Sequence, residues 1–410
     1  MTEIRPHDGL LPALRSIEIV PFERGEDDVY FALHDRLQLA PGSLAVSAVG
    51  YFVLAHLDGQ HTCADIQAEF RKRVGMDLPE AEIHKLVRVL DEALLLDGDR
   101  FAQALAERRS AYLAAPARDN RNRYPNAVEL RAEIEQMLAA GVAAPVVDLC
   151  GVIAPHLDYA RGAPCYADAY ATLAKVAPAA RYVILGTNHS GMSPCVVATS
   201  RDFHTSLGLV PTDRAFISRL EGRLGQTLLG EETDHLLEHS VELQVHILQV
   251  ILRDRSFAIV PVLCPDVCGP TGTAPLDGDG PDLRDFASAL ADEIASDGVR
   301  TIIIAGADLS HVGRHFNDPQ ATTPAFLEAV AASDKALLTL LEARDEDAFV
   351  ARLGANDNAT RICSAGCIFA LLKALPGCHC RILKYHQAVD MPAETHVTCA
   401  AAVVTNGTGS

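Results

Sequence analysis

The sequence lacks the features that mark a membrane-spanning or secreted protein. No apolar run reaches the length of a bilayer span, and the opening residues, MTEIRPHDGLLPALRS, contain no apolar signal-peptide core. The 11 cysteines are scattered over 410 residues and do not resemble a disulfide framework. We therefore expect a cytoplasmic protein in which most cysteines are buried thiols and a few are available as ligands.

The sequence also has fewer basic residues than acidic ones. Lys and Arg number 35 against 54 Asp and Glu, which gives a formal net charge of −19. Nucleic acids and anionic membranes are bound by basic patches, so this balance argues against both as partners. Apolar residues make up 49% of the chain, which is enough to build a large core over two or three domains.

Residues 1–101 are expected to form a small separate domain. Helices are predicted over 43–59, after Thr62 and after Pro79, and the segment 94–101 reads as a short strand and turn. Three helices and a terminal hairpin predict a winged helix. The segment LDGQHTCADI resembles the PqqD-like peptide-recognition modules, and such a module implies a bound peptide. Acidic residues outnumber basic ones here, which disfavours DNA binding.

An α/β domain is predicted over 146–410, after a transition at 102–145 that holds a polar segment and a lead-in helix. Its strands are expected at 147–154, 181–185, 195–199, 257–263, 300–305, 380–386 and 396–404. Its helices are expected at 165–176, 212–223, 236–252, 283–296, 324–342 and 363–375.

Two histidines directly follow apolar runs that read as buried strands. His156 follows CGVIAP, and His189 follows YVILGTN. In an open α/β sheet, ligands and chemistry collect outside the carboxyl ends of the strands. Two such histidines predict a metal or acid–base centre, although each could instead cap a helix or fill a turn.

Asp308 and His311 stand in a similar position, after the apolar run VRTIIIAG. A carboxylate there can orient an imidazole or bind a metal, and an imidazole can transfer protons near neutral pH. The alternative is that Asp308 only caps the following turn.

The segment EHSVELQVH, residues 238–246, is expected to lie inside a helix. His239 and Glu242 are three residues apart, so one helical face could present an imidazole and a carboxylate as catalytic groups. A polar helix face in solvent explains the same pattern.

Cys363 is predicted at the start of a helix, where the positive end of the helix dipole favours the thiolate that a metal needs. Cys367, one turn later, is expected in the core. Taken alone, Cys363 could equally be a buried thiol.

Six motifs, in this order, resemble the Memo family, which includes the bacterial AmmeMemoRadiSam system protein B. They are PHLDY (155–159), GTNHS (186–190), TSLG (205–208), EHSVE (238–242), GADLSH (306–311) and RICSAG (361–366), and the resemblance covers about residues 117–404. It implies the α/β fold of the class III extradiol dioxygenases, a central sheet with flanking helices.

The resemblance also implies a metal site. Its ligands would be His156, His189 and Cys363, and Asp308 and His311 would lie beside the metal, with His311 in the position of an acid–base catalyst. Two imidazoles and a thiolate suit Fe(II), Cu or Zn, and Fe(II) is the first expectation.

We therefore expect a dioxygenase-like redox enzyme of unknown substrate. The resemblance implies two partners, a radical SAM protein and an AMMECR-type protein. The alternative is a non-enzymatic adaptor that uses the same cleft to hold a peptide or a metal.

Overall fold

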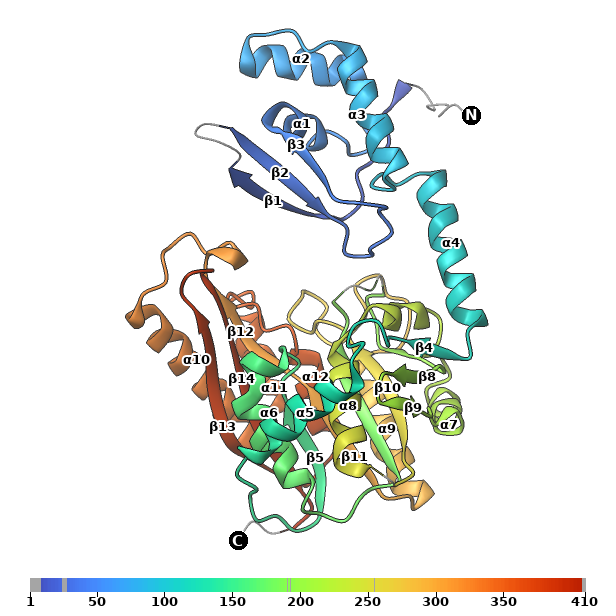
Figure 1. Ribbon diagram of the computed structural model, residues 1–410, viewed down its shortest axis with the longest axis vertical. Helices are drawn as coiled ribbons and strands as arrows, with labels where there is room; N and C mark the ends of the chain where they lie inside the picture. Colours follow the sequence, from blue (N-terminus) through green and yellow to red (C-terminus); the bar gives the residue numbers. More distant parts are fainter. Residues whose placement is uncertain (1–8, 24–27, 190, 192, 254, 408–410) are drawn as a thin grey trace. The chain divides into compact units, whose positions relative to one another are not determined.

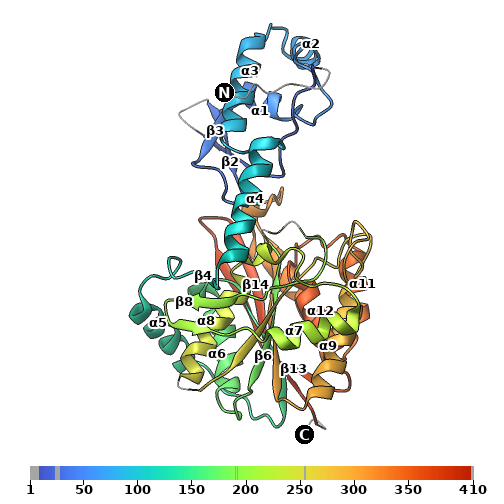
Figure 2. The same cartoon turned by 90° about the vertical axis from the view of Figure 1, so that its right-hand side faces the viewer.

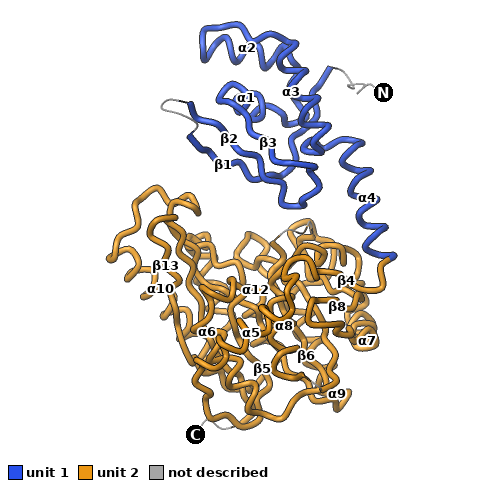
Figure 3. Tube along the Cα trace, viewed as in Figure 1, with its two compact units in different colours: residues 1–114 blue, residues 115–410 orange. Residues whose placement is uncertain are grey.

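The computed structural model describes residues 9–23, 28–189, 191, 193–253 and 255–407. The chain divides into two compact units, residues 1–114 and residues 115–410 (Figure 3). The segment expected as a transition, 102–145, is shared between them. Its first part belongs to a long helix of the first unit, and its remainder belongs to the second unit.

The first unit is built from an antiparallel sheet followed by helices. The strands pair in the order β1 (Glu18–Glu23), β2 (Val29–His34) and β3 (Leu44–Ser47). The helices are α1 (Ala48–Leu54), α2 (Cys63–Val74), α3 (Glu80–Glu92) and α4 (Asp99–Ala114). As predicted, Thr62 caps α2 and Pro79 directly precedes α3.

The prediction of a short strand and turn at 94–101, which would form a terminal hairpin, was wrong. Leu96 makes only an isolated bridge with Leu14, and α4 begins at Asp99, where the Gly98 carbonyl accepts the first helical hydrogen bond. The sheet of this unit instead precedes its helices. The segment 43–59, expected to be all helix, begins as β3, because Leu44 and Val46 alternate with smaller residues and pair with β2.

An eight-stranded mixed sheet forms the centre of the second unit (Figure 1). Its order is β12 (Asp308–Val312), β14 (Thr395–Thr405), β5 (Leu149–Ala154), β11 (Thr301–Gly306), β6 (Arg181–Thr187), β10 (Ala258–Cys264) and β7 (Val197–Ala198), and β13 (His379–Asp390) pairs with β14. The neighbours β5, β11, β6 and β10 run parallel. Their carboxyl ends therefore meet at one edge of the sheet.

Helices cover both faces of this sheet (Figure 2). Tyr182 and Ile184 of β6 pack on one side, and Val183 and Leu185 pack on the other, as the pleat of a doubly covered strand requires. The first face carries α5 (Ala127–Ala139), α6 (Tyr159–Leu173) and α8 (Ser240–Leu252). The second carries α7 (Arg214–Leu224), α9 (Leu283–Asp297), α10 (Pro324–Glu342), α11 (Glu346–Gly354) and α12 (Ala365–Ala374).

The α/β architecture predicted for the second unit is thus confirmed, and its strands and helices lie close to their expected ranges. Elements that the sequence did not indicate are a small sheet of β4 (Ala117–Asp119), β8 (Asp202–Thr205) and β9 (Gly208–Val210), and also β12 and α11. No helix in the described part of the chain combines the length and apolarity that a bilayer crossing requires.

Candidate metal centre

The candidate site lies where the parallel strands end. His156 follows β5 after one proline, His189 follows β6 after one asparagine, and Asp308 is two residues beyond the end of β11. The three runs that the sequence marked as strand-to-loop junctions are therefore neighbours in space, as predicted from the rule for open sheets.

His156 is held rigidly at this edge. Its side chain is 3% exposed, its Nδ1 lies 2.9 Å from the carbonyl oxygen of Gly306, and its Nε2 lies 3.5 Å from a carboxylate oxygen of Asp308. Burial alone would lower its pKa, but the charges of Asp308 and Cys363 outweigh burial and raise the pKa to about 9. The Nε2 position is thus poised for a cation, and a metal ion would take the place of its proton.

His189 is oriented by Glu238. Its Nδ1 lies 3.1 Å and 3.2 Å from the two carboxylate oxygens, and its backbone N–H donates to the same carboxylate at 2.8 Å. Burial opposes the charged imidazole, but Glu238 dominates and raises the pKa of His189. A carboxylate on the far ring nitrogen is the usual support of a metal-binding histidine, because it fixes the tautomer that leaves Nε2 available.

Glu238 is buried, and three backbone N–H groups donate to it, those of His189, His239 and Ser240. Burial by itself would raise its pKa, yet the adjacent His189 and these donors hold the pKa well below the usual range. Glu238 is therefore a permanent anion directly behind the candidate ligands. In the sequence, Glu238 stands out only by its spacing of four residues from Glu242 in the segment 238–246, and its role behind His189 was not predicted.

His239 completes a group of three imidazoles. Its ring stacks on His189 with centroids 5.0 Å apart and meets His156 edge-on at 5.7 Å. One nitrogen from each of the three rings lies within 4.8 Å of the others. Burial lowers the pKa of His239 to about 3, so its ring is neutral at physiological pH.

Two glycines let the segment of His239 approach the strand ends. A Cβ on Gly186 would lie 2.4 Å from Ser240 Oγ, and a Cβ on Gly306 would lie 2.8 Å from the Ser240 carbonyl oxygen. Both distances are shorter than side chains allow, so only glycine fits. The start of α8 can therefore sit directly on β6 and β11, which brings His239 beside His189.

Cys363 approaches from the opposite face, two residues before α12. Its Sγ lies 3.4 Å from His156 Nε2 and 3.4 Å from Ser364 Oγ. Cys367 is fully buried, and burial raises the pKa of its thiol well above the ordinary value, as expected for a core cysteine. Of the two thiols, Cys363 is thus the one that contacts a candidate ligand.

Asp308 and His311 both belong to the site. Asp308 accepts from the His156 backbone N–H at 3.2 Å and is 1% exposed. His311 lies on β12, where its Nδ1 is 3.0 Å from the Leu309 carbonyl and its ring packs edge-on against Phe316. Burial lowers the pKa of His311, so its ring is neutral at physiological pH and can accept a proton.

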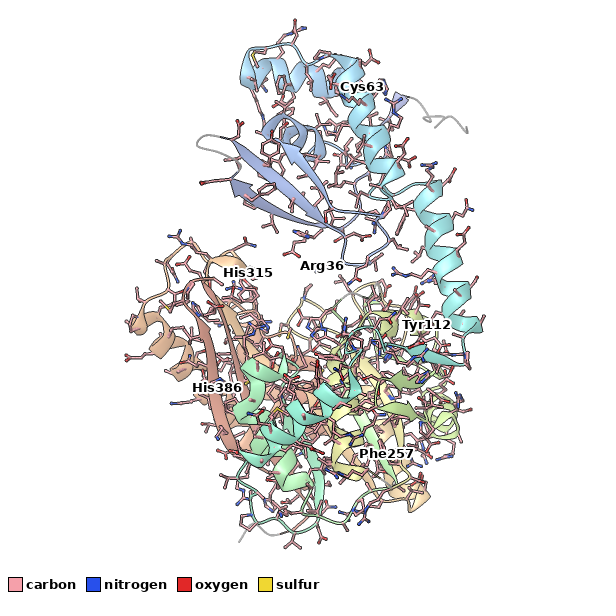
Figure 4. The ribbon with its side chains drawn as sticks, viewed as in Figure 1. Arg36, Cys63, Tyr112, Phe257, His315 and His386 are labelled. Atoms are coloured by element: carbon pink, nitrogen blue, oxygen red, sulfur yellow. The ribbon has the colours of Figure 1, made fainter. Side chains whose placement is uncertain are left out.

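A cavity of about 480 Å³ connects these groups. Its lining includes His156, His189, His239, His311 and Asp308. The lining also includes two arginines, Arg123 and Arg161, and two aromatic residues, Tyr124 and Phe316. A further histidine of the lining, His315, is labelled in Figure 4. Such a space admits a small organic molecule next to the imidazoles.

Glu242 does not line this cavity. The prediction that His239 and Glu242 share one helical face was wrong, because α8 begins at Ser240 and His239 precedes it. Glu242 is fully buried and pairs with Arg118 at 2.9 Å, and Asn120 donates to the same oxygen. Its carboxylate supports the site from behind and is not exposed to a substrate.

Arg118, on β4, is the residue that the sequence analysis missed most clearly. It is 2% exposed and also donates to the backbone carbonyls of His235 and Glu238. Its guanidinium lies 4.8 Å above the ring of Phe203. Arg118 therefore anchors the loop that carries Glu238 and His239.

Comparison with known proteins gives consistent matches. The family model described as "Memo-like protein" matches residues 122–404. Over 400 residues the chain is 26% identical to a MEMO1 family protein of Aquifex aeolicus, with 96% of this chain and 99% of the relative covered. A MEMO1 family protein of Thermus thermophilus is 27% identical over 84% of this chain and 99% of its own length, and one of Methanopyrus kandleri is 29% identical over 62% and 83%.

Proposed function

Because the chain belongs to the Memo-like protein family, we propose that its second unit binds one transition metal ion and acts as a metal-dependent redox enzyme. The observation that carries the proposal is the grouping of three imidazoles, those of His156, His189 and His239, beside a cavity large enough for a substrate. Cys363 joins this group through His156, whose Nε2 lies 3.4 Å from its Sγ.

We assign the ion to His156, His189 and Cys363. Sulfur and nitrogen donors on a tetrahedral metal are about 3.5 Å apart, and Cys363 Sγ lies 3.4 Å from His156 Nε2. The rings of His156 and His189 are 4.8 Å apart between centroids. His239 is the competing third ligand, since one of its nitrogens lies within 4.8 Å of a nitrogen of each of the other two rings.

The residues present fit a soft or borderline ion. Imidazole and thiolate donors favour Fe(II), Cu or Zn over Mg or Ca, and Fe(II) is the ion that we propose first. When bound, iron or copper would supply one-electron chemistry, whereas zinc would act only as a Lewis acid. The chain itself supplies Asp308, which orients His156, and Glu238, which orients His189.

His311 is proposed as the group that moves a proton. Its ring lines the cavity and is neutral because burial lowers its pKa. The Leu309 carbonyl accepts from Nδ1, so the lone pair of Nε2 is free to take a proton from a bound molecule. Arg123 and Arg161 in the same lining provide positive charge for an anionic substrate.

A His311→Ala variant tests the redox proposal. We expect the iron-loaded variant to keep its metal but to consume oxygen in the presence of reductant about a hundredfold more slowly, the scale of a lost acid–base group. Oxygen uptake and metal content are measured together on the full chain. Equal turnover in both proteins, or none in either, would favour a cleft that only binds a metal or a peptide.

A Glu238→Gln variant tests the orientation of His189. The amide keeps the shape of the side chain but places an NH₂ group against the backbone N–H groups that donate to Glu238. It therefore no longer fixes the His189 ring, and metal affinity should fall about 10- to 100-fold. Asp158→Asn is the matched control, because Asp158 lines the same cavity and loses the same charge but contacts Arg161 rather than a histidine. Equal losses in both variants would mean that charge alone, and not orientation, matters.

The expected partnership with a radical SAM protein and an AMMECR-type protein stays a prediction from the family resemblance. The same holds for a peptide bound to the first unit.

A further inference from the structure

A second group of metal-binding side chains lies in the first unit, outside the site proposed above. It consists of Cys63, Glu80 and His84, whose donor atoms all lie within 4.8 Å of one another. Cys63 is the first residue of α2 and is labelled in Figure 4. Glu80 and His84 are four residues apart in the first turns of α3, so they share one face of that helix.

Local structure fixes where these side chains can meet. A capping box between Thr62 and Asp65 sets the first turn of α2 and hence the position of Cys63. Pro79 sets the start of α3, and Ile83, Val87 and Leu90 bury its apolar face in the core of the unit. Cys63 is 9% exposed, whereas the side chains of Glu80 and His84 are 63% and 58% exposed. The thiol is thus buried and the two other groups cover it from the solvent side.

No protonation state of the His84 ring gives strong hydrogen bonds to both of its neighbours. His84 Nε2 lies 3.6 Å from Cys63 Sγ and 3.2 Å from Glu80 Oε1. If Nε2 carries a hydrogen, it donates to the carboxylate and can interact only weakly with the sulfur. If Nε2 is bare, the thiol can donate to it, but an ionised carboxylate then faces a lone pair. A cation satisfies all three atoms at once.

The same distances match the geometry of a tetrahedral metal ion. Zinc bonds of about 2.3 Å to sulfur and 2.0 Å to nitrogen and oxygen separate S from N by about 3.5 Å and N from O by about 3.3 Å. We propose that Cys63, Glu80 and His84 form a second metal site, which takes a zinc-class divalent ion and completes its coordination with water.

The ion would join the starts of α2 and α3. Each helix contributes at least one ligand, so binding stabilises the folded first unit in proportion to the affinity. Ligation requires the thiolate form of Cys63, so loading becomes weaker as the pH falls. This site shares no residue with the one assigned to His156, His189 and Cys363, so either proposal can fail alone.

Cobalt(II) titration of the full chain provides the test. A thiolate bound to cobalt gives a charge-transfer band in the near ultraviolet, which a protonated or distant thiol does not. We use a His156→Ala/Cys363→Ser background, in which the site proposed for the second unit has lost its thiol. We expect this protein to bind one equivalent of cobalt with the band present, and added zinc to displace the cobalt and remove the band.

Further variants in that background distinguish the loss of a ligand from unfolding of the first unit. Cys63→Ser should abolish the band, and His84→Ala should lower cobalt affinity by at least about tenfold. Because His84 is exposed, its replacement leaves the core intact, so a loss of binding cannot be attributed to unfolding. His61→Ala is the control and should change nothing, since His61 is a partly exposed histidine that pairs with Asp58. A missing band in the background protein, or a band that survives Cys63→Ser, would overturn the proposal.

Discussion

His189→Ala should leave the chain folded but remove the metal ion of the second unit. The side chain of His189 is 30% exposed, so its loss opens no sealed cavity, whereas the site loses one of its donors. Protein purified without chelator should carry about one iron ion per chain in this site, and the variant should carry less than about a tenth of that iron, whatever zinc the first unit holds. Elemental analysis, with circular dichroism to confirm folding, measures both quantities.

Parallel variants identify the third ligand. Under our assignment Cys363→Ser loses the metal as His189→Ala does, while His239→Ala retains it. His315→Ala is the matched control, because His315 lines the same cavity and contacts only Phe316 among the rings of the described residues. The reverse pattern, with metal lost from His239→Ala and kept by Cys363→Ser, would replace the sulfur ligand by a third imidazole. Full metal in all of these variants would contradict the site itself.

The sequence was sufficient to predict which strand ends meet at the candidate site. His156, His189 and Asp308 each follow an apolar run, and the carboxyl ends of parallel strands must meet at one edge. That inference needs only the type of each element and no knowledge of strand order. The inference is therefore independent of the wrong predictions for the first unit, where the strand Leu44–Ser47 forms part of a longer apolar segment that was predicted to be a helix.

The supporting residues could not be predicted in the same way. Glu238 and His239 were expected inside a helix, because nothing in EHSVELQ marks Ser240 as the first helical residue. The close approach of that segment depends on Gly186 and Gly306, and a glycine at a strand end reads equally well as a simple turn. Distinguishing the two needs the distance to a segment more than fifty residues away.

The role of Arg118 is even harder to predict from the sequence. It lies among several arginines in a polar stretch, and Arg121 and Arg123 have the same chemistry in the sequence. The structure separates them by burial, since the side chain of Arg118 is 1% exposed and that of Arg121 is 55% exposed. Burial of a charged residue is a property of the tertiary fold, and local composition does not contain it.

Arg118→Met should therefore destabilise the second unit strongly. The substitution leaves the buried Glu242 carboxylate with only the longer pair to Arg123, at 3.8 Å, and frees the carbonyls of His235 and Glu238. Removing one partner of a buried ion pair costs about 3–5 kcal/mol in the free energy of unfolding. Urea unfolding followed by circular dichroism measures the loss. Arg121→Met is the control and should change stability by less than about 0.5 kcal/mol, because its pair with Asp119 is exposed.

A double variant distinguishes the lost ion pair from lost packing. In Arg118→Met/Glu242→Leu no fully buried charge is left unpaired, since Arg123, which also pairs with Glu242, is 33% exposed, so part of the stability should return. If the double variant is as unstable as the sum of its parts, the role of Arg118 is to fill space beside Phe203, where its guanidinium lies 4.8 Å above the ring. Metal content separates the two roles again. If the double variant recovers stability but not metal, the hydrogen bonds from Arg118 to the carbonyls of His235 and Glu238 are needed to position the loop that carries Glu238 and His239.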